Sequence, residues 1–161
     1  MVAQSTQRQD SFFTLPSHPV GYLAIVATLT TAGIHLLLGP RVMGFSQTLG
    51  TLFMLNGLGF LGGLLLYSSR YWRPELYLVA AGYAIVTIFA LFAFQGFSFD
   101  AFYMQGNLNP LAVVPKVAEA ILALCATYLC DILLAVNSEA SHAWGIPVSR
   151  RWQRVLTLRS P

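Results

Sequence analysis

Four long apolar runs dominate the pattern of hydrophobic and polar positions along the chain. They cover residues 20–39, 48–67, 76–94 and 110–136, and the first three contain no Asp, Glu, Lys or Arg. A helix of about 20 apolar residues crosses the hydrocarbon core of a bilayer and satisfies its own backbone hydrogen bonds there. The pattern therefore predicts an all-α, integral membrane four-helix bundle, placed in the cell membrane as a multi-pass protein.

Composition supports this interpretation, because 56% of the 161 residues are hydrophobic and only 9% are charged. A soluble domain has about 25% charged residues. We expect a polar N-terminal tail at 1–19, a four-span transmembrane domain at 20–136 and a cytoplasmic tail at 137–161. With no separate soluble domain to host an active site, we expect a protein that is not an enzyme, has no cofactor and binds no nucleic acid.

Basic residues near the membrane ends predict the topology, because Lys and Arg normally stay on the cytoplasmic side. Arg8 lies in the amino tail, Arg70 and Arg73 lie in the second connection, and four arginines follow residue 149, whereas the first connection has only Arg41. Both termini are therefore predicted to be cytoplasmic.

Local signals predict where two of the helices end or begin. Gly39 and Pro40 should end the first span, because proline breaks the backbone hydrogen-bond ladder. Asn109 and Pro110 are an N-cap and first-turn pair that should start the fourth.

Small residues in the second run predict close helix packing. Gly59 and Gly63 form a GxxxG pair, and Asn56 lies on the same helix face. We expect Asn56 to form a hydrogen bond across a helix contact. Whether that contact forms within one chain or between two chains is left open.

Three costly polar residues share one height in the predicted bundle. His35 comes four residues before Gly39, and Lys116 comes six after Pro110, so both lie roughly 6–10 Å below the outer surface. Glu119 is three residues after Lys116 and can pair with it on one helix face.

Thr28 and Thr31 extend the polar stripe of the first helix, which predicts a small polar pocket between the first and fourth helices. The pocket is either a site for a polar ligand or a proton relay, or a buried network that fixes helix register. A further alternative is that Lys116 reaches out to the interface while Glu119 stays neutral.

The other end of the bundle carries a different predicted pair. Asp131 lies near the cytoplasmic end of the fourth run, where Arg70 or Arg73 can reach it. We expect an interfacial ion pair there.

Redox and metal sites find little support in the sequence. Only His35 lies inside a span, so haem would need His35 with Met43 or Met54, or with a second copy of the chain. Cys125 and Cys130 are five residues apart, which is neither a CxxC pair nor a metal-ligand spacing. We expect buried thiols and no metal site.

The carboxyl tail alternates apolar residues with arginines, an arrangement typical of a segment that lies on anionic lipid or docks on a partner subunit. The residues expected to make this contact are Trp144, Arg150, Arg151, Trp152 and Arg154.

Several stretches, among them AGIHLLLG at 32–39, LNGLGFLGGLLLY at 55–67 and NPLAVVPKVAEAILA at 109–123, resemble a family of small four-helix integral membrane proteins of unknown function common in haloarchaea. The likeness covers residues 20–136. In that family an acidic residue tends to precede the lysine and a glutamine is frequent at position 119, whereas this chain has Pro115 and Glu119. The resemblance implies a fold and a location but no reaction, and a sequence pI of about 9.1 argues against a high-salt host.

Three functions follow from these patterns. The leading hypothesis is a non-enzymatic accessory or assembly subunit that packs against other membrane subunits or against itself. The alternative is a small-molecule or proton carrier that uses His35, Lys116 and Glu119. A redox subunit that holds haem or quinone comes third.

Overall fold

The computed structural model describes residues 16–144 of the chain, and the side chains at 95, 101 and 137–144 lie outside this description. The four long helices of this range are α1 (Pro19–Met43), α2 (Gln47–Tyr67), α3 (Glu75–Gln95) and α4 (Pro110–Trp144). A short 3-10 helix, η1 (Phe99–Phe102), and a hairpin of β1 (Tyr103–Met104) and β2 (Asn107–Leu108) join α3 to α4. Each long helix is apolar and long enough to cross a membrane, as predicted.

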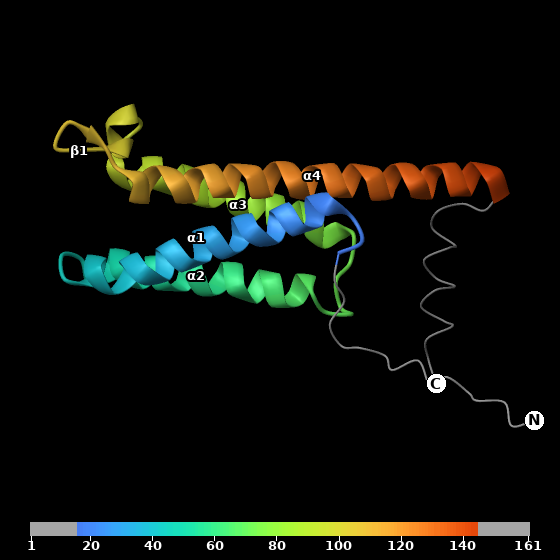
Figure 1. Cartoon of the computed structure of the whole chain (residues 1–161), viewed down its shortest axis with the longest axis horizontal. Coiled ribbons are helices and arrows are strands. Elements are labelled where there is room, and N and C mark those ends of the chain that lie inside the picture. The colour runs from blue at the N-terminus through green and yellow to red at the C-terminus, as the bar shows by residue number, and fades with distance from the viewer. Residues whose placement is uncertain (1–15, 145–161) are drawn as a thin grey trace, which may run out of the picture.

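The four helices do not pack symmetrically. α1 lies between α2 and α4, and α3 packs on α4, as Figure 1 shows. The backbones of α2 and α3 make little contact, and the Tyr83 side chain of α3 reaches across to Asn56 of α2. The apolar stretches of α1 and α4 are accordingly 39% buried, whereas those of α2 and α3 are only 17% buried. The bundle therefore has a groove between α2 and α3.

The helix ends agree with the sequence at one predicted signal and differ at the other. Asn109 caps α4, since its Oδ1 accepts a hydrogen bond from the Leu111 amide at 3.1 Å. The predicted end of the first span at Pro40 is wrong, because α1 continues through Pro40 to Met43. Proline removes only its own N–H, so the residues that follow it can still find carbonyl acceptors. The candidate span of α4 ends at Val136, as predicted, while the helix itself continues to Trp144.

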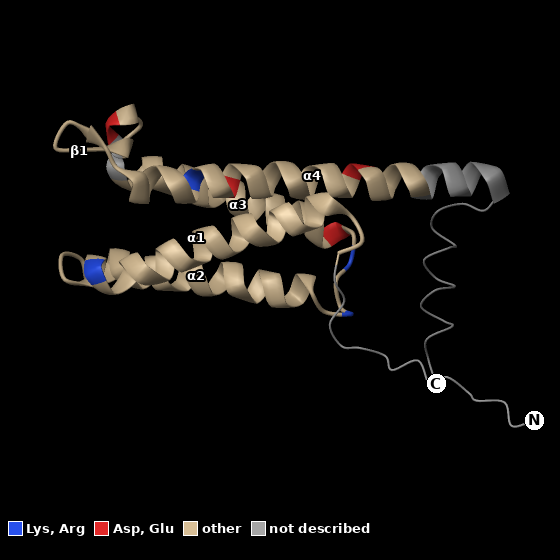
Figure 2. Cartoon of the chain, in the orientation of Figure 1, with Lys and Arg blue, Asp and Glu red and all other residues tan. Residues whose placement is uncertain are grey.

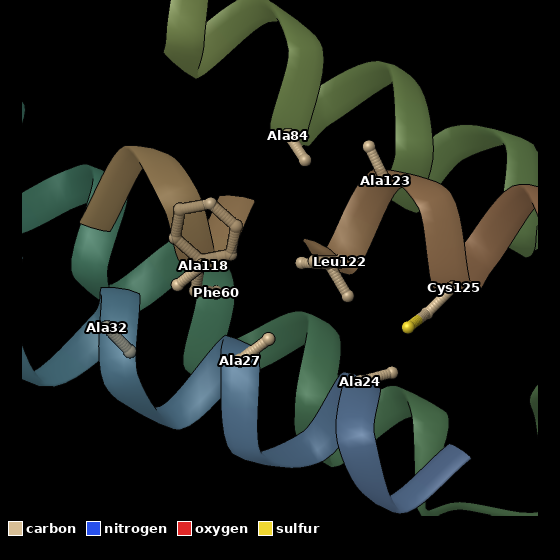
Figure 3. Packing of buried hydrophobic residues seen from close by; sticks show 9 residues of the cluster. All are labelled: Ala24, Ala27, Ala32, Phe60, Ala84, Ala118, Leu122, Ala123 and Cys125. Atoms are coloured by element: carbon tan, nitrogen blue, oxygen red, sulfur yellow. The ribbon is translucent and has the colours of Figure 1, made fainter. Parts of the chain in front are cut away.

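Small side chains fill the core where the helices meet. Figure 3 shows alanines of α1 and α4 in one cluster with Phe60 of α2, and Ala123 of α4 pointing toward Ala84 of α3. Small residues allow helices to approach closely where no water-driven hydrophobic effect draws them together. Cys125 and Cys130 are buried free thiols, as predicted.

The close approach of α1 and α2 uses glycines other than the predicted pair. A Cβ added at Gly57 would lie 2.7 Å from Leu36 Cγ and 3.1 Å from the Ala32 carbonyl oxygen. Gly59 instead faces the hydroxyl of Tyr83, and no atom lies within 4 Å of a Cβ added at Gly63. Among the described residues the GxxxG pair therefore brings no second helix backbone close, because Gly59 meets only the Tyr83 side chain of α3, and its use between chains stays a prediction.

Candidate functional site

The three polar residues predicted at one height lie side by side. The Nζ atom of Lys116 is 2.7 Å from Oε2 of Glu119 on α4, and Nε2 of His35 on α1 is 3.8 Å from Oε1 of the same carboxylate. Figure 2 shows that charged residues are sparse along the four helices and that most lie toward the ends of the bundle. An ion pair inside the apolar region is therefore the exception in this molecule.

Glu119 is the centre of the network and is fully buried. Its Oε1 accepts a hydrogen bond from the Thr31 hydroxyl at 3.0 Å, and its Oε2 accepts one from Lys116. Because both oxygens act as acceptors, the contacts fit an ionised carboxylate. A buried charge persists only when it is paired and hydrogen-bonded, and both conditions hold here.

Lys116 connects the network to α3. Its Nζ donates a second hydrogen bond to the backbone carbonyl of Thr87, at 2.9 Å. An ammonium group has three N–H donors, and the described residues supply acceptors for two of them. The side chain is 11% exposed, compared with 0% for Glu119. The third N–H is therefore free to bind a ligand.

His35 is held in one orientation by α1. Its Nδ1 lies 2.8 Å from the Thr31 carbonyl oxygen, so we assign the ring proton to Nδ1 as the donor of that bond. Phe53 and Phe60 of α2 pack against the imidazole ring, with centroids 5.2 and 6.2 Å away. In the neutral ring Nε2 then carries the lone pair, and its 3.8 Å separation from Glu119 is too long for a hydrogen bond.

A cavity of about 640 Å³ lies beside this network. Its wall is mostly apolar, and residues from all four helices contribute to it. Among the described residues that line it, Arg41 and Lys116 are charged and no carboxylate is present, since Glu119 is buried behind the wall. The polar lining residues are His35, Arg41, Asn56, Tyr83, Thr87, Asn109 and Lys116.

Tyr83 lines both this cavity and a second one of about 260 Å³. Its hydroxyl donates a hydrogen bond to Oδ1 of Asn56 at 2.7 Å, so the side chain of α3 spans the groove to α2. Asn56 thus forms a hydrogen bond to another helix, as predicted, but the bond crosses the groove to Tyr83 and does not lie at a close helix contact. Tyr83 and Thr87 are site residues that the sequence analysis missed, because they lie in a run whose pattern shows only apolarity.

The remaining predicted residues lie away from the cluster. Arg70, Arg73 and Asp131 are exposed, and Arg70 contacts the hydroxyl and ring of Tyr71. The ion pair of Asp131 with Arg70 or Arg73 stays a prediction. The side chain of Trp144 lies outside the described residues, as do Arg150, Arg151, Trp152 and Arg154. Between residues 16 and 144, no group of three or more His, Cys, Asp or Glu residues is placed to hold a metal ion.

Comparison with known proteins adds a family and little else. No curated protein and no solved structure matches the chain. A family model does match, over residues 6–130, a range that includes α1, α2, α3 and the part of α4 that carries Lys116 and Glu119. The chain therefore belongs to DUF7475, a family of unknown function.

Proposed function

We propose that the chain is a multi-pass protein of the cell membrane with both termini in the cytoplasm. The four apolar helices support the location, as do the large apolar side chains exposed on their outer faces, such as Leu37, Val86 and Leu124. A monomer in water rarely exposes so much contiguous apolar surface. The distribution of arginines between the two ends supports the orientation.

We infer that the protein binds a small amphiphile with an acidic head group in the larger cavity. The observation that carries this inference is the third N–H of Lys116, which has no acceptor among the described residues and belongs to a side chain that lines the cavity. A carboxylate or phosphate oxygen is the acceptor that an ammonium group binds most strongly.

The rest of the lining supports the same class of ligand. Arg41 adds a second positive charge, and the described residues that line the cavity include no carboxylate to repel an anion. Nε2 of His35 can accept a hydrogen bond from a protonated acid or a hydroxyl group. The apolar remainder of the wall suits an alkyl chain, and a volume of about 640 Å³ is within the usual range for ligand pockets.

Binding of laurate tests this proposal, with dodecanol as the uncharged control of equal chain length. Both are titrated against the protein in lipid nanodiscs by equilibrium dialysis, and nanodiscs without protein correct for partition into lipid. A charge-assisted hydrogen bond contributes about 1.5–3 kcal/mol, so laurate should bind at least about ten-fold more tightly than dodecanol. Equal affinity for the two molecules contradicts the proposal.

Two variants test whether the affinity for laurate depends on Lys116 and Glu119. Glu119→Gln leaves Lys116 without its counter-ion, so laurate should bind as tightly as before or more tightly. The double variant Lys116→Met/Glu119→Gln removes both charges together and should lose the preference for laurate. If a proton relay through Glu119 is the function instead, Glu119→Gln abolishes a pH-dependent flux that the wild-type protein shows in liposomes.

The hypothesis of an accessory or assembly subunit is a second proposal, and open glycines on α2 support it. No atom lies within 4 Å of a Cβ added at Gly62 or Gly63, so a helix of another chain can approach there. Purification in mild detergent should then bring down stoichiometric partners or a homo-oligomer. A lone, monodisperse monomer contradicts this hypothesis and leaves the ligand-binding proposal intact.

A further inference from the structure

His35 presents a hydrogen-bond acceptor to the larger cavity. Its Nδ1–H donates to the Thr31 carbonyl oxygen, so Nε2 of the neutral ring can only accept, and the Glu119 carboxylate at 3.8 Å offers it no proton. Trp72 Nε1 is the one fully enclosed side-chain nitrogen or oxygen without a partner in residues 16–144, so the unpaired Nε2 of His35 keeps accessible surface. His35 is 5% exposed and lines the larger cavity, and its Nε2 therefore opens into that cavity.

Asn56 supplies donors beside this acceptor. It lies on the face of α2 that carries Phe53 and Phe60, the two residues that pack on the His35 ring. Its Oδ1 accepts the hydrogen bond of Tyr83, whereas its two amide N–H groups have no acceptor in the described part of the chain. A hydroxyl group is the smallest neutral group that both donates and accepts, so it matches this pair of side chains.

Lys116 and His35 are close enough to hold one head group. Nζ of Lys116 and Nε2 of His35 lie 2.7 and 3.8 Å from the two oxygens of a single carboxylate, that of Glu119. An ionised acid has no proton to donate, so the acid that pairs with Lys116 leaves Nε2 of His35 without a donor. An ammonium group on the ligand could donate, but Lys116 and Arg41 repel it.

We infer that the ligand of the larger cavity is a hydroxy fatty acid whose hydroxyl group is on carbon 2 or 3. The inference rests on the proposed binding of an acidic amphiphile. The carboxylate accepts the third N–H of Lys116, while the hydroxyl group donates to Nε2 of His35 and accepts from the Asn56 amide. The alkyl chain then lies against the apolar part of the wall.

Isomers of hydroxylaurate test this inference, with laurate as the reference. The control is 12-hydroxylaurate, which carries the same two groups at opposite ends of the chain. Each acid is titrated against the full-length protein in nanodiscs by equilibrium dialysis at about pH 8, where an imidazole is normally neutral. An uncharged hydrogen bond is worth about five-fold in affinity, so 2-hydroxylaurate or 3-hydroxylaurate should bind about five-fold more tightly than laurate. The isomer that gains affinity identifies the carbon, and 12-hydroxylaurate should gain none.

Three variants test whether the gain depends on His35. His35→Phe keeps an aromatic ring and removes the acceptor, so the ratio of affinities for the gaining isomer and laurate should fall to about one. His35→Gln places an acceptor oxygen at a similar distance from the backbone and should recover part of the ratio. Leu38→Phe is the matched control, because Leu38 lines the same cavity from α1 and has no polar atom in its side chain. It should change both affinities by the same factor.

Three results overturn the inference: no gain by either isomer, an equal gain by 12-hydroxylaurate, or a ratio that His35→Phe leaves unchanged. Failure of the proposed acid site gives a different result, because laurate then binds no more tightly than dodecanol. If laurate binds more tightly than dodecanol and the hydroxy acids gain nothing, only the hydroxyl assignment is wrong.

Discussion

Lys116→Met should destabilise the protein more than any other single change in the polar cluster. Methionine is close to lysine in length and apolar, so the substitution removes the charge and preserves most of the packing. It leaves Glu119 fully buried, with Thr31 as its one remaining hydrogen-bond donor among the described residues. Removal of one partner from a buried ion pair costs about 3–5 kcal/mol, because the other charge stays uncompensated.

Glu119→Gln should cost less, about 1.5–3 kcal/mol, the contribution of a hydrogen bond to a charged group. Two features of the structure cause the difference. Glutamine keeps an acceptor oxygen for Thr31 or Lys116, and the 11% exposed Lys116 side chain retains its bond to the Thr87 carbonyl. The double variant carries no buried charge, so we expect it to be more stable than Lys116→Met alone by about 2 kcal/mol.

The assay is reversible unfolding in mixed micelles, followed by circular dichroism as the denaturing detergent is increased. All four proteins of the double-mutant cycle are measured under one condition. A cost below about 1 kcal/mol for Lys116→Met shows that the pair is not buried as described. A double variant less stable than Lys116→Met refutes the argument that the uncompensated carboxylate causes the loss.

Three further predictions concern the polar cluster, the contact of α1 with α2, and the groove. Thr31→Val should lower the free energy of unfolding by about 1–3 kcal/mol in the same assay, because a buried carboxylate loses one donor and no volume is lost. Gly57→Ala should destabilise the protein by about 1–3 kcal/mol, because the added methyl group overpacks the contact of α1 with α2. Gly63→Ala is the control and should have no such effect, since nothing lies near that position. Equal unfolding midpoints for the two variants would contradict the described contact. Tyr83→Phe removes the hydrogen bond to Asn56 and should cost about 1 kcal/mol, and hydrogen exchange should show faster opening of α3.

The sequence predicts the four helices well because each of them is a long apolar stretch, of the length that could cross a bilayer, and such a stretch is easily found in a sequence. The meeting of His35, Lys116 and Glu119 also follows from the sequence, since residues at equal height on packed helices face a common interior. The error at Pro40 arises because a proline signal near a helix end does not tell whether one more turn can form beyond it.

The groove between α2 and α3 lies beyond such reasoning. Hydropathy reports how apolar a run is but not which face meets which neighbour, so the uneven burial of the helices does not appear in the sequence pattern. The pairing of Asn56 with Tyr83 depends on that helix order. The hairpin before α4 was missed as well, although Gln105 and Gly106, with φ of 53° and 78°, form the tight turn that a Gln-Gly dipeptide permits.

That hairpin and the neighbouring η1 have a consequence for how the protein sits in a bilayer. Phe97 and Phe99 are more than four-fifths exposed, and Tyr103, Met104 and Leu108 are also largely exposed. Aromatic side chains settle at the boundary between lipid and water. In the proposed membrane setting, η1 and the hairpin act as an interfacial anchor. They resist movement of the bundle along the bilayer normal in either direction. The immersion depth of the ammonium–carboxylate pair is then set by a connecting segment rather than by helix length.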